Sequence, residues 1–207
     1  MEEPPTHRVP QLVLTMGEWK HPVKWLYGAL TEVVRERLNR IKTKWEGIIG
    51  DPIQSKEWEK IIAYPQNISR NTRLKYIQLN YLHQTYLTPK KITAIFGGEP
   101  KKCPRCARLE ADFEHMVWSC TYAQEYWVKI LDKLKSTLER EIACTLKVCI
   151  LVLFVRPKER KVGNRFVDLA LALAKRRLSM SWKCPIGPEI TKWESEVKIW
   201  AGAKEQA

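Results

Sequence analysis

Apolar residues recur at helical spacing through most of the chain. Between Trp25 and Trp45 they return every three or four positions, and basic residues occupy several of the positions between them. This pattern predicts an amphipathic helix, which Gly50-Asp51-Pro52 is expected to end. Ser55 then stands at the N-cap position of a short second helix.

The next two helices are predicted by their caps as well as by their spacing. Asn71 or Ser69 is expected to cap a helix over roughly residues 70–87, where the apolar positions form one stripe. Thr88-Pro89 combines an N-cap residue with a proline at the first helical position. This pair predicts a short helix that runs to Phe96 and stops at the two glycines that follow.

The carboxy-terminal half of the chain predicts further helices. Helical patterns begin at Tyr122, Phe166 and Trp193, and three alanines in the second of them permit close packing. The run 148–155 is apolar on all sides, so a buried helix and a buried strand both remain open. The chain shows no internal repeat. These patterns predict a mainly α, helical bundle-like domain.

The composition favours a folded protein with a polyanionic partner. Of the 207 residues 44% are hydrophobic, and 36 lysines and arginines against 23 acidic residues give a formal charge of +13. This excess points to RNA, DNA or an anionic lipid surface. The longest apolar run is too short to span a membrane, and the amino terminus lacks a signal-peptide pattern. We therefore expect an intracellular protein, in a cytoplasmic or nuclear ribonucleoprotein, with no membrane and no small-molecule substrate among its partners.

The most specific pattern is a group of three cysteines and one histidine. Cys103, Cys106, His115 and Cys120 follow one another with two, eight and four residues between them. Thiolates and an imidazole in this number suit a tetrahedral zinc ion, and four protein ligands leave no open position for catalysis. The first pair alone could equally be a redox pair. The whole group predicts one structural zinc ion (Zn2+) in a small CCHC zinc-knuckle insert.

This insert divides the chain into four expected parts. Residues 1–17 contain three prolines and little periodicity, so they are expected to be a flexible extension. Residues 18–100 form the N-terminal helical region, 101–121 the zinc knuckle, and 122–207 the C-terminal helical region.

Basic residues near the predicted knuckle are the expected contacts to nucleic acid. They are Arg70, Arg73, Lys90, Lys91, Lys101, Lys102, Arg105 and Arg108. Trp118 and Tyr122 could stack on unpaired bases, although packing of the knuckle against the following helix is the stronger expectation. Cys144, Cys149 and Cys184 lie in apolar or proline-flanked sequence and are expected to be inert core residues.

Several further motifs occur in a fixed order. They are Leu74-Lys75-Tyr76-Ile77-Gln78-Leu79, Tyr86-Leu87-Thr88-Pro89-Lys90-Lys91-Ile92, Cys103-Pro104-Arg105-Cys106, His115-Met116-Val117-Trp118-Ser119-Cys120, Tyr126-Trp127, Ala172-Leu173-Ala174-Lys175, Trp182-Lys183, Pro188 and Trp193. Together they resemble the segment that follows the reverse transcriptase in the polyprotein of LINE-type (non-LTR) retrotransposons, the reverse-transcriptase zinc-binding domain family. The resemblance covers roughly residues 25–200.

The resemblance implies zinc ligands at Cys103, Cys106, His115 and Cys120. It also implies that the segment binds element RNA or target DNA during target-primed reverse transcription, with the reverse-transcriptase portion of the parent polyprotein as a further partner. One departure is Ala107, where related knuckles often carry glycine.

An enzymatic activity is not expected. The polymerase of the family needs adjacent aspartates to hold magnesium, and this chain has no Asp-Asp pair. No nucleophile–base pair or open metal site is visible either. Two other interpretations stay open, namely a structural scaffold that docks on the polymerase and a truncated element copy without function.

Overall fold

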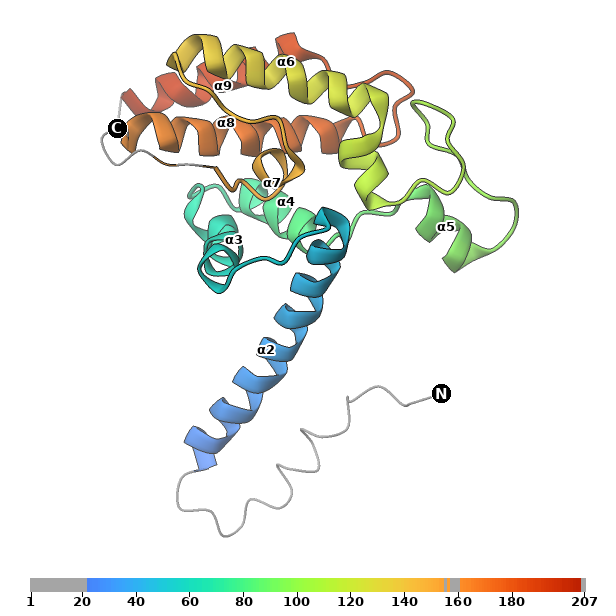
Figure 1. Ribbon diagram of the computed structural model, residues 1–207, viewed down its shortest axis with the longest axis vertical. Coiled ribbons are helices and arrows are strands. Elements are labelled where there is room, and N and C mark those ends of the chain that lie inside the picture. The colour runs from blue at the N-terminus through green and yellow to red at the C-terminus, as the bar shows by residue number, and fades with distance from the viewer. Residues whose placement is uncertain (1–21, 155, 157–160, 206–207) are drawn as a thin grey trace. The chain divides into compact units, whose positions relative to one another are not determined.

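The computed structural model describes residues 22–154, 156 and 161–205 (Figure 1). The chain divides into two compact units, residues 1–44 and 45–207, and each is described by itself. The expected flexible extension, residues 1–17, lies outside the described residues.

Helix α2, Pro22–Ile49, begins in the first unit and ends in the second. The side chains described between residues 32 and 44 are mostly exposed, and ion pairs join Glu32 to Arg35 and Glu36 to Arg40. The helix ends where Gly50 takes a φ of 78°, a conformation that glycine adopts without steric strain. The predicted helix and its end are confirmed.

The second unit is built from helices, as the sequence pattern predicts. They are α3 (Ser55–Asn67), α4 (Thr72–Leu82), α5 (Pro89–Phe96), the π-helical turn η3 (His115–Ser119), α6 (Thr121–Leu138), α7 (Leu146–Cys149), α8 (Lys161–Met180) and α9 (Ile190–Glu205). The described residues contain no strand, and their one antiparallel bridge joins Lys102 to Leu109. The mainly α fold class is therefore confirmed. None of the described helices is both long and apolar enough to cross a membrane.

Side-chain caps begin two of the predicted helices. Asn71 Oδ1 accepts a hydrogen bond from Leu74 N at 3.0 Å at the start of α4. Thr88 Oγ1 accepts one from Lys91 N at 3.2 Å at the start of α5. Each cap satisfies a backbone N–H that has no partner within its own helix, so these two predictions are confirmed.

Two predicted boundaries differ from the structure. Helix α4 ends at Leu82 rather than near residue 87, because the chain turns at Gln84, where φ is 53°. The predicted cap at Ser55 is wrong by one position. Gln54 is the extended residue before α3, and its backbone N donates to Glu57 Oε2 at 3.3 Å.

Helix α8 lies at the centre of the second unit. It contacts α4, α6 and α9, and Figure 1 shows α4 on one side of it and α6 and α9 on the other. Ala170, Ala172 and Ala174 have no exposed surface. Their small side chains let the neighbouring helices approach α8 closely, as the alanine pattern predicts.

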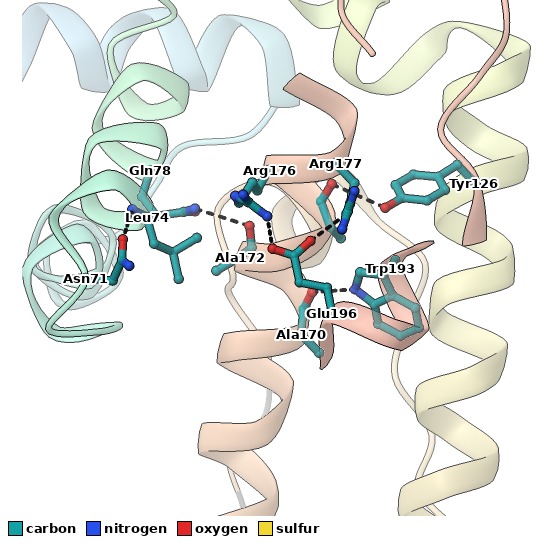
Figure 2. A network of polar contacts seen from close by, with 11 residues as sticks. Asn71, Leu74, Gln78, Tyr126, Ala170, Ala172, Arg176, Arg177, Trp193 and Glu196 are labelled. Carbon is teal, nitrogen blue, oxygen red and sulfur yellow. Dashed lines mark hydrogen bonds and ion pairs between the residues drawn. The ribbon is translucent and has the colours of Figure 1, made fainter. Parts of the chain in front are cut away.

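Side chains of the neighbouring helices donate hydrogen bonds to backbone carbonyl groups of α8. The indole Nε1 of Trp193 donates to Ala170 O at 2.9 Å, and Gln78 Nε2 donates to Ala172 O at 3.4 Å (Figure 2). Each bond satisfies a buried donor, and a shifted helix would leave it unpaired. These bonds therefore fix how α4 and α9 lie along α8.

Ionic contacts join α9 to α8 next to these bonds. Glu196 is 5% exposed, and its carboxylate pairs with the guanidinium groups of both Arg176 and Arg177 (Figure 2). The adjacent Lys175 is buried, and its Nζ donates to Ile150 O at 3.0 Å. The three consecutive basic residues Lys175, Arg176 and Arg177 therefore make contacts within the helical core.

The apolar run 148–155 is neither one helix nor one strand over its described residues. It begins inside α7, Leu146–Cys149, and leaves helical structure after a turn. The expectation that the remaining cysteines are all core residues is wrong for two of them. Cys149 is buried, but Cys144 and Cys184 are exposed, because they lie in the loops before α7 and after α8.

Candidate metal centre

The first two cysteines of the predicted knuckle lie in a tight hairpin turn. Its arms meet at the antiparallel bridge between Lys102 and Leu109. Cys103 N donates to Arg108 O at 2.7 Å and closes the turn. Cys106 lies inside this closed loop, so its thiol group lies close to that of Cys103.

The residue after the second cysteine takes the conformation that glycine usually supplies. Ala107 has a φ of 60°, and its backbone N donates to Cys103 O at 3.0 Å. The left-handed region costs a residue with a Cβ atom roughly 1–2 kcal/mol. Alanine thus makes this turn at the expense of local strain, which a glycine would avoid.

The other two residues of the group lie at the ends of a π-helical turn. Cys120 N donates to His115 O at 2.9 Å, which is the i to i+5 bond that defines such a turn. The wider turn brings His115 and Cys120 onto one side of η3, which explains the four-residue spacing between them. Cys120 is also the residue directly before α6. The amino end of a helix carries a partial positive charge, which favours the thiolate form of Cys120.

These two elements bring the four predicted ligands together. The ligand atoms of Cys103, Cys106, His115 and Cys120 all lie within 4.8 Å of one another. Three of the residues are buried and Cys106 is half-buried. The group could therefore hold a metal ion.

Both ring nitrogens of His115 have a polar neighbour. Nε2 lies 3.2 Å from Cys106 Sγ, and Nδ1 lies 3.4 Å from a terminal nitrogen of Arg108. Arg108 can only donate, so Nδ1 accepts and Nε2 carries the ring proton in this arrangement. Ligation of a metal through Nε2 would need the other tautomer, with Arg108 moved away from Nδ1. Burial lowers the pKa of His115, and the charge of Arg108 lowers it further. The neutral ring at pH 7 is the form that binds metals.

The thiol groups differ in their electrostatic environment. Burial raises the pKa of Cys120 to about 11, although the positive charge of Arg105 opposes this rise. Burial acts in the same direction on Cys103. Hydrogen bonds from backbone groups of Cys106 and Arg105, the side chain of Cys106 and the charge of Arg105 together outweigh it, so the pKa is lowered overall. A bound metal ion would displace the protons of all three thiols.

Arg105 has a role that sequence reasoning missed. It is 6% exposed, one terminal nitrogen donates to Met116 O, and its other side-chain nitrogens have no hydrogen-bond partner among the described residues. Its charge favours thiolates at Cys103 and Cys120. Three thiolates around a divalent ion leave one net negative charge, which a buried guanidinium group balances. Arg105 is thus enclosed beside the thiols and is not exposed on the surface, where a contact to nucleic acid was expected.

The segment that carries the group is anchored in the helical core. Phe113 is 4% exposed, and its ring centroid lies 6.1 Å from that of Trp45 and 5.7 Å from that of Tyr81. The indole Nε1 of Trp127 donates to Val117 O at 2.8 Å. This packing fixes η3 against α6, independently of any metal.

Most of the other basic residues named from the sequence near the knuckle are exposed. Lys90, Lys101, Lys102 and Arg108 all have exposed side chains. Lys90 N donates to Ala111 O at 3.1 Å, which places the start of α5 beside the knuckle. Lys91 differs, because it is half-buried and its ammonium group donates to a backbone carbonyl.

The remaining two predicted contacts lie elsewhere. Arg70 and Arg73 are exposed at the amino end of α4, whereas the knuckle segment packs near the carboxyl end through Tyr81 and Phe113. A helix of 11 residues is about 16 Å long. The structure therefore separates these two arginines from the metal centre.

Acidic residues of the same segment lie beside the metal centre as well. Glu110 and Asp112 are exposed, and Glu114 is half-buried and accepts a hydrogen bond from Ser119. Asp112 Oδ1 accepts one from His115 N at 2.9 Å and so helps to orient the ligand segment. The surface around the metal centre is therefore of mixed charge.

The candidate stacking residues are not enclosed. Trp118 is half-buried in η3, and Tyr122 is 42% exposed in the first turn of α6. The fold and the site together define a mainly α protein with a Cys3His group that could hold a metal ion. No model of a known protein family matches the chain, and a search of the curated proteins finds no match.

Proposed function

We propose that the chain is a zinc-stabilised nucleic-acid-binding module related to the segment that follows the reverse transcriptase of LINE-type retrotransposons. The observation that carries the proposal is the convergence of Cys103, Cys106, His115 and Cys120 within 4.8 Å, next to exposed basic side chains. Its role would be to hold element RNA or target DNA during target-primed reverse transcription, without catalytic residues of its own.

The donor set supports zinc as the metal. Sulfur atoms of a tetrahedral zinc site lie about 2.3 Å from the ion, and hence about 3.8 Å from one another. The ligand atoms all lie within 4.8 Å of one another, and Cys106 Sγ lies 3.2 Å from His115 Nε2, so only small side-chain movements are needed to reach this geometry. Thiolates with one imidazole favour zinc over magnesium or calcium, which take oxygen ligands. When bound, zinc would supply structural cross-linking of the hairpin and η3.

The exposed basic residues support a polyanionic partner. Lys101, Lys102 and Arg108 lie on the hairpin itself, and Lys90 lies at the start of α5 beside it. Each phosphate contact on a single strand contributes about −0.7 to the dependence of log affinity on log salt concentration. Affinity for nucleic acid should therefore fall as the salt concentration rises and should depend on these side chains.

A salt titration of the zinc-loaded chain tests this function. Fluorescence anisotropy with a labelled single-stranded RNA and a DNA duplex of equal length measures affinity over a series of salt concentrations. We expect Lys101→Ala and Lys102→Ala each to lower the slope for RNA by about 0.7. Lys198→Ala, at an exposed position on α9, is the matched control and should leave the slope unchanged.

Arg105→Gln distinguishes a surface contact from a role at the metal. With zinc in excess this variant should keep the wild-type slope, because Arg105 is buried. Affinity that does not change with salt in the wild-type chain, or equal losses at Lys102 and Lys198, would count against nucleic-acid binding.

A docking scaffold for the polymerase is the second candidate, and an exposed apolar surface favours it. Ile95 is 62% exposed and Phe96 is 75% exposed at the end of α5. Exposed apolar residues that adjoin one another mark interaction surfaces. If docking is the function, the isolated chain should self-associate in light scattering, and Phe96→Ser should reduce this without changing the affinity for RNA. The absence of any salt-dependent binding and of self-association would favour a truncated element copy without function.

A further inference from the structure

A second pair of cysteines lies outside the metal centre. Thr145 caps α7 by accepting a hydrogen bond from Val148 N at 3.3 Å, so Cys144 is the residue before the cap and Cys149 is the fourth residue of the helix. Side chains at these two positions characteristically pack against each other. The two thiol groups lie close enough that each is the largest influence on the pKa of the other.

The two thiols differ in their access to solvent. Cys144 is exposed, whereas Cys149 has no exposed surface. This combination of an accessible thiol and a buried partner in contact with it is that of a reactive cysteine and its resolving cysteine. From this geometry we propose that Cys144 and Cys149 form a peroxide-sensitive dithiol that closes to a disulfide bond.

The chemistry balances with hydrogen peroxide as the oxidant. The Cys144 thiolate attacks one peroxide oxygen, the O–O bond breaks, and hydroxide leaves, which gives a sulfenic acid on Cys144. The Cys149 sulfur then attacks the Cys144 sulfur, the S–O bond breaks, and the thiol proton leaves with the hydroxyl group as water. The dithiol loses two electrons, and peroxide gains them.

The surroundings of Cys144 favour the first step. Its hydrogen bond with Cys149 lowers the pKa of Cys144 to about 7, partial burial opposes this, and the positive charge of Lys135 assists it. The nearby Asp132 acts in the opposite direction. The lowered pKa raises the fraction of thiolate, the form that reacts with peroxide, at pH 7.

Trypsin makes the disulfide directly observable. Cleavage after Arg140 and Lys147 places Cys144 in one peptide, residues 141–147, and Cys149 in the next. The zinc-loaded full chain is treated with one equivalent of hydrogen peroxide, blocked with N-ethylmaleimide, digested and analysed by mass spectrometry. We expect the two peptides joined, two hydrogens lighter than their sum, while the peptide of the exposed Cys184 stays reduced.

Two variants separate the steps. Cys149→Ala, if circular dichroism shows it folded, should leave Cys144 as a sulfenic acid that dimedone traps. Cys144→Ser, at an exposed position, should leave Cys149 reduced. Peroxide oxidation of Cys184 at the same rate as Cys144, or the absence of the joined peptides, would overturn the proposal.

The rate of alkylation tests the reactivity of Cys144 without substitution of the buried Cys149. Iodoacetamide should alkylate Cys144 in the folded wild-type chain about threefold faster at pH 7 than it alkylates Cys144 in a synthetic peptide of residues 141–147. The threefold value combines the larger thiolate fraction with the lower nucleophilicity of a thiolate of lower pKa. A rate no higher than that of the peptide would contradict the proposal.

Discussion

Replacing Ala107 by glycine should strengthen the metal centre. Ala107 is exposed and has a φ of 60°, so removal of its methyl group relieves strain of roughly 1–2 kcal/mol and opens no cavity. Glycine also makes the unfolded chain more flexible, which offsets about 0.5–1 kcal/mol. The hydrogen bond from residue 107 N to Cys103 O is kept. The net gain is therefore about 0.5–1 kcal/mol in favour of the closed turn.

This gain should appear as metal affinity. The turn of Cys103 and Cys106 must close around the metal, so a gain of about 0.5–1 kcal/mol strengthens binding about two- to fivefold. Competition with a chromophoric zinc chelator measures the dissociation constant. Glu139→Gly is the matched control, because Glu139 is also exposed and left-handed, with a φ of 47°, at the end of α6. The control should raise the free energy of unfolding and leave zinc affinity unchanged.

The two variants together can refute the reasoning. Weaker or unchanged zinc binding by Ala107→Gly would show that the turn does not have the left-handed conformation on which the metal geometry depends. Equal gains in zinc affinity from Ala107→Gly and Glu139→Gly would show that general stability, and not the turn, controls binding.

Three further predictions concern the metal and the core. Cys106→Ser should abolish zinc binding and lower the free energy of unfolding by about 3 kcal/mol or more, and chelator should then no longer lower the melting temperature. Burial lowers the pKa of Lys175 to about 7, although the charge of Asp168 opposes this. Between pH 7 and about pH 10, Lys175 is therefore protonated in the unfolded chain and neutral in the folded chain. Urea denaturation should therefore show stability rising by about 1.4 kcal/mol per pH unit around pH 8.5, and Lys175→Met should remove this slope. Glu196→Gln should lower the free energy of unfolding by about 2–3 kcal/mol, less than for a fully buried ion pair, because the two arginine partners are about a quarter exposed. Glu189→Gln, in an exposed pair, should change the free energy of unfolding by less than about 0.5 kcal/mol in the same assay.

The sequence predicts those features of the fold that local chemistry controls. Thr88-Pro89 and Gly97 mark the two ends of α5 because capping, the fixed φ of proline and the positive φ of glycine act on single residues. The end of α4 at Leu82 is not predicted, because the apolar stripe continues past it and the turn at Gln84 has no glycine to mark it.

The metal ligands follow from sequence for a similar reason. Cys103 and Cys106 are close in the chain, and one turn brings them together whatever surrounds them. The environment of Arg105 could not be predicted in this way. Its burial depends on η3, which folds back over the hairpin and offers the carbonyl group of Met116. A basic residue between two cysteines therefore gives no sequence signal that separates a counter-charge from a phosphate contact.

The cysteine pair at α7 is a second case in which the sequence does not predict the environment of a residue. Cys144 and Cys149 looked like core residues because their neighbours in sequence are apolar. The contact between them needs both the cap at Thr145 and an apolar run that leaves helical structure soon after it, and periodicity did not decide between helix and strand there. Apolar neighbours in sequence therefore predict the burial of Cys149 correctly and that of Cys144, in the loop before α7, incorrectly.

The arrangement also indicates which properties should depend on the metal. The helices around α8 are held by buried donors such as Trp193 and by ring contacts of Phe113, none of which involves a metal ligand. The hairpin at Lys102 and Leu109, in contrast, has one backbone bridge and few buried side chains of its own. Removal of the metal should therefore release the hairpin and its exposed lysines while the helices remain folded. If the proposed function is correct, chelation should weaken RNA binding far more than it lowers the helical signal in circular dichroism.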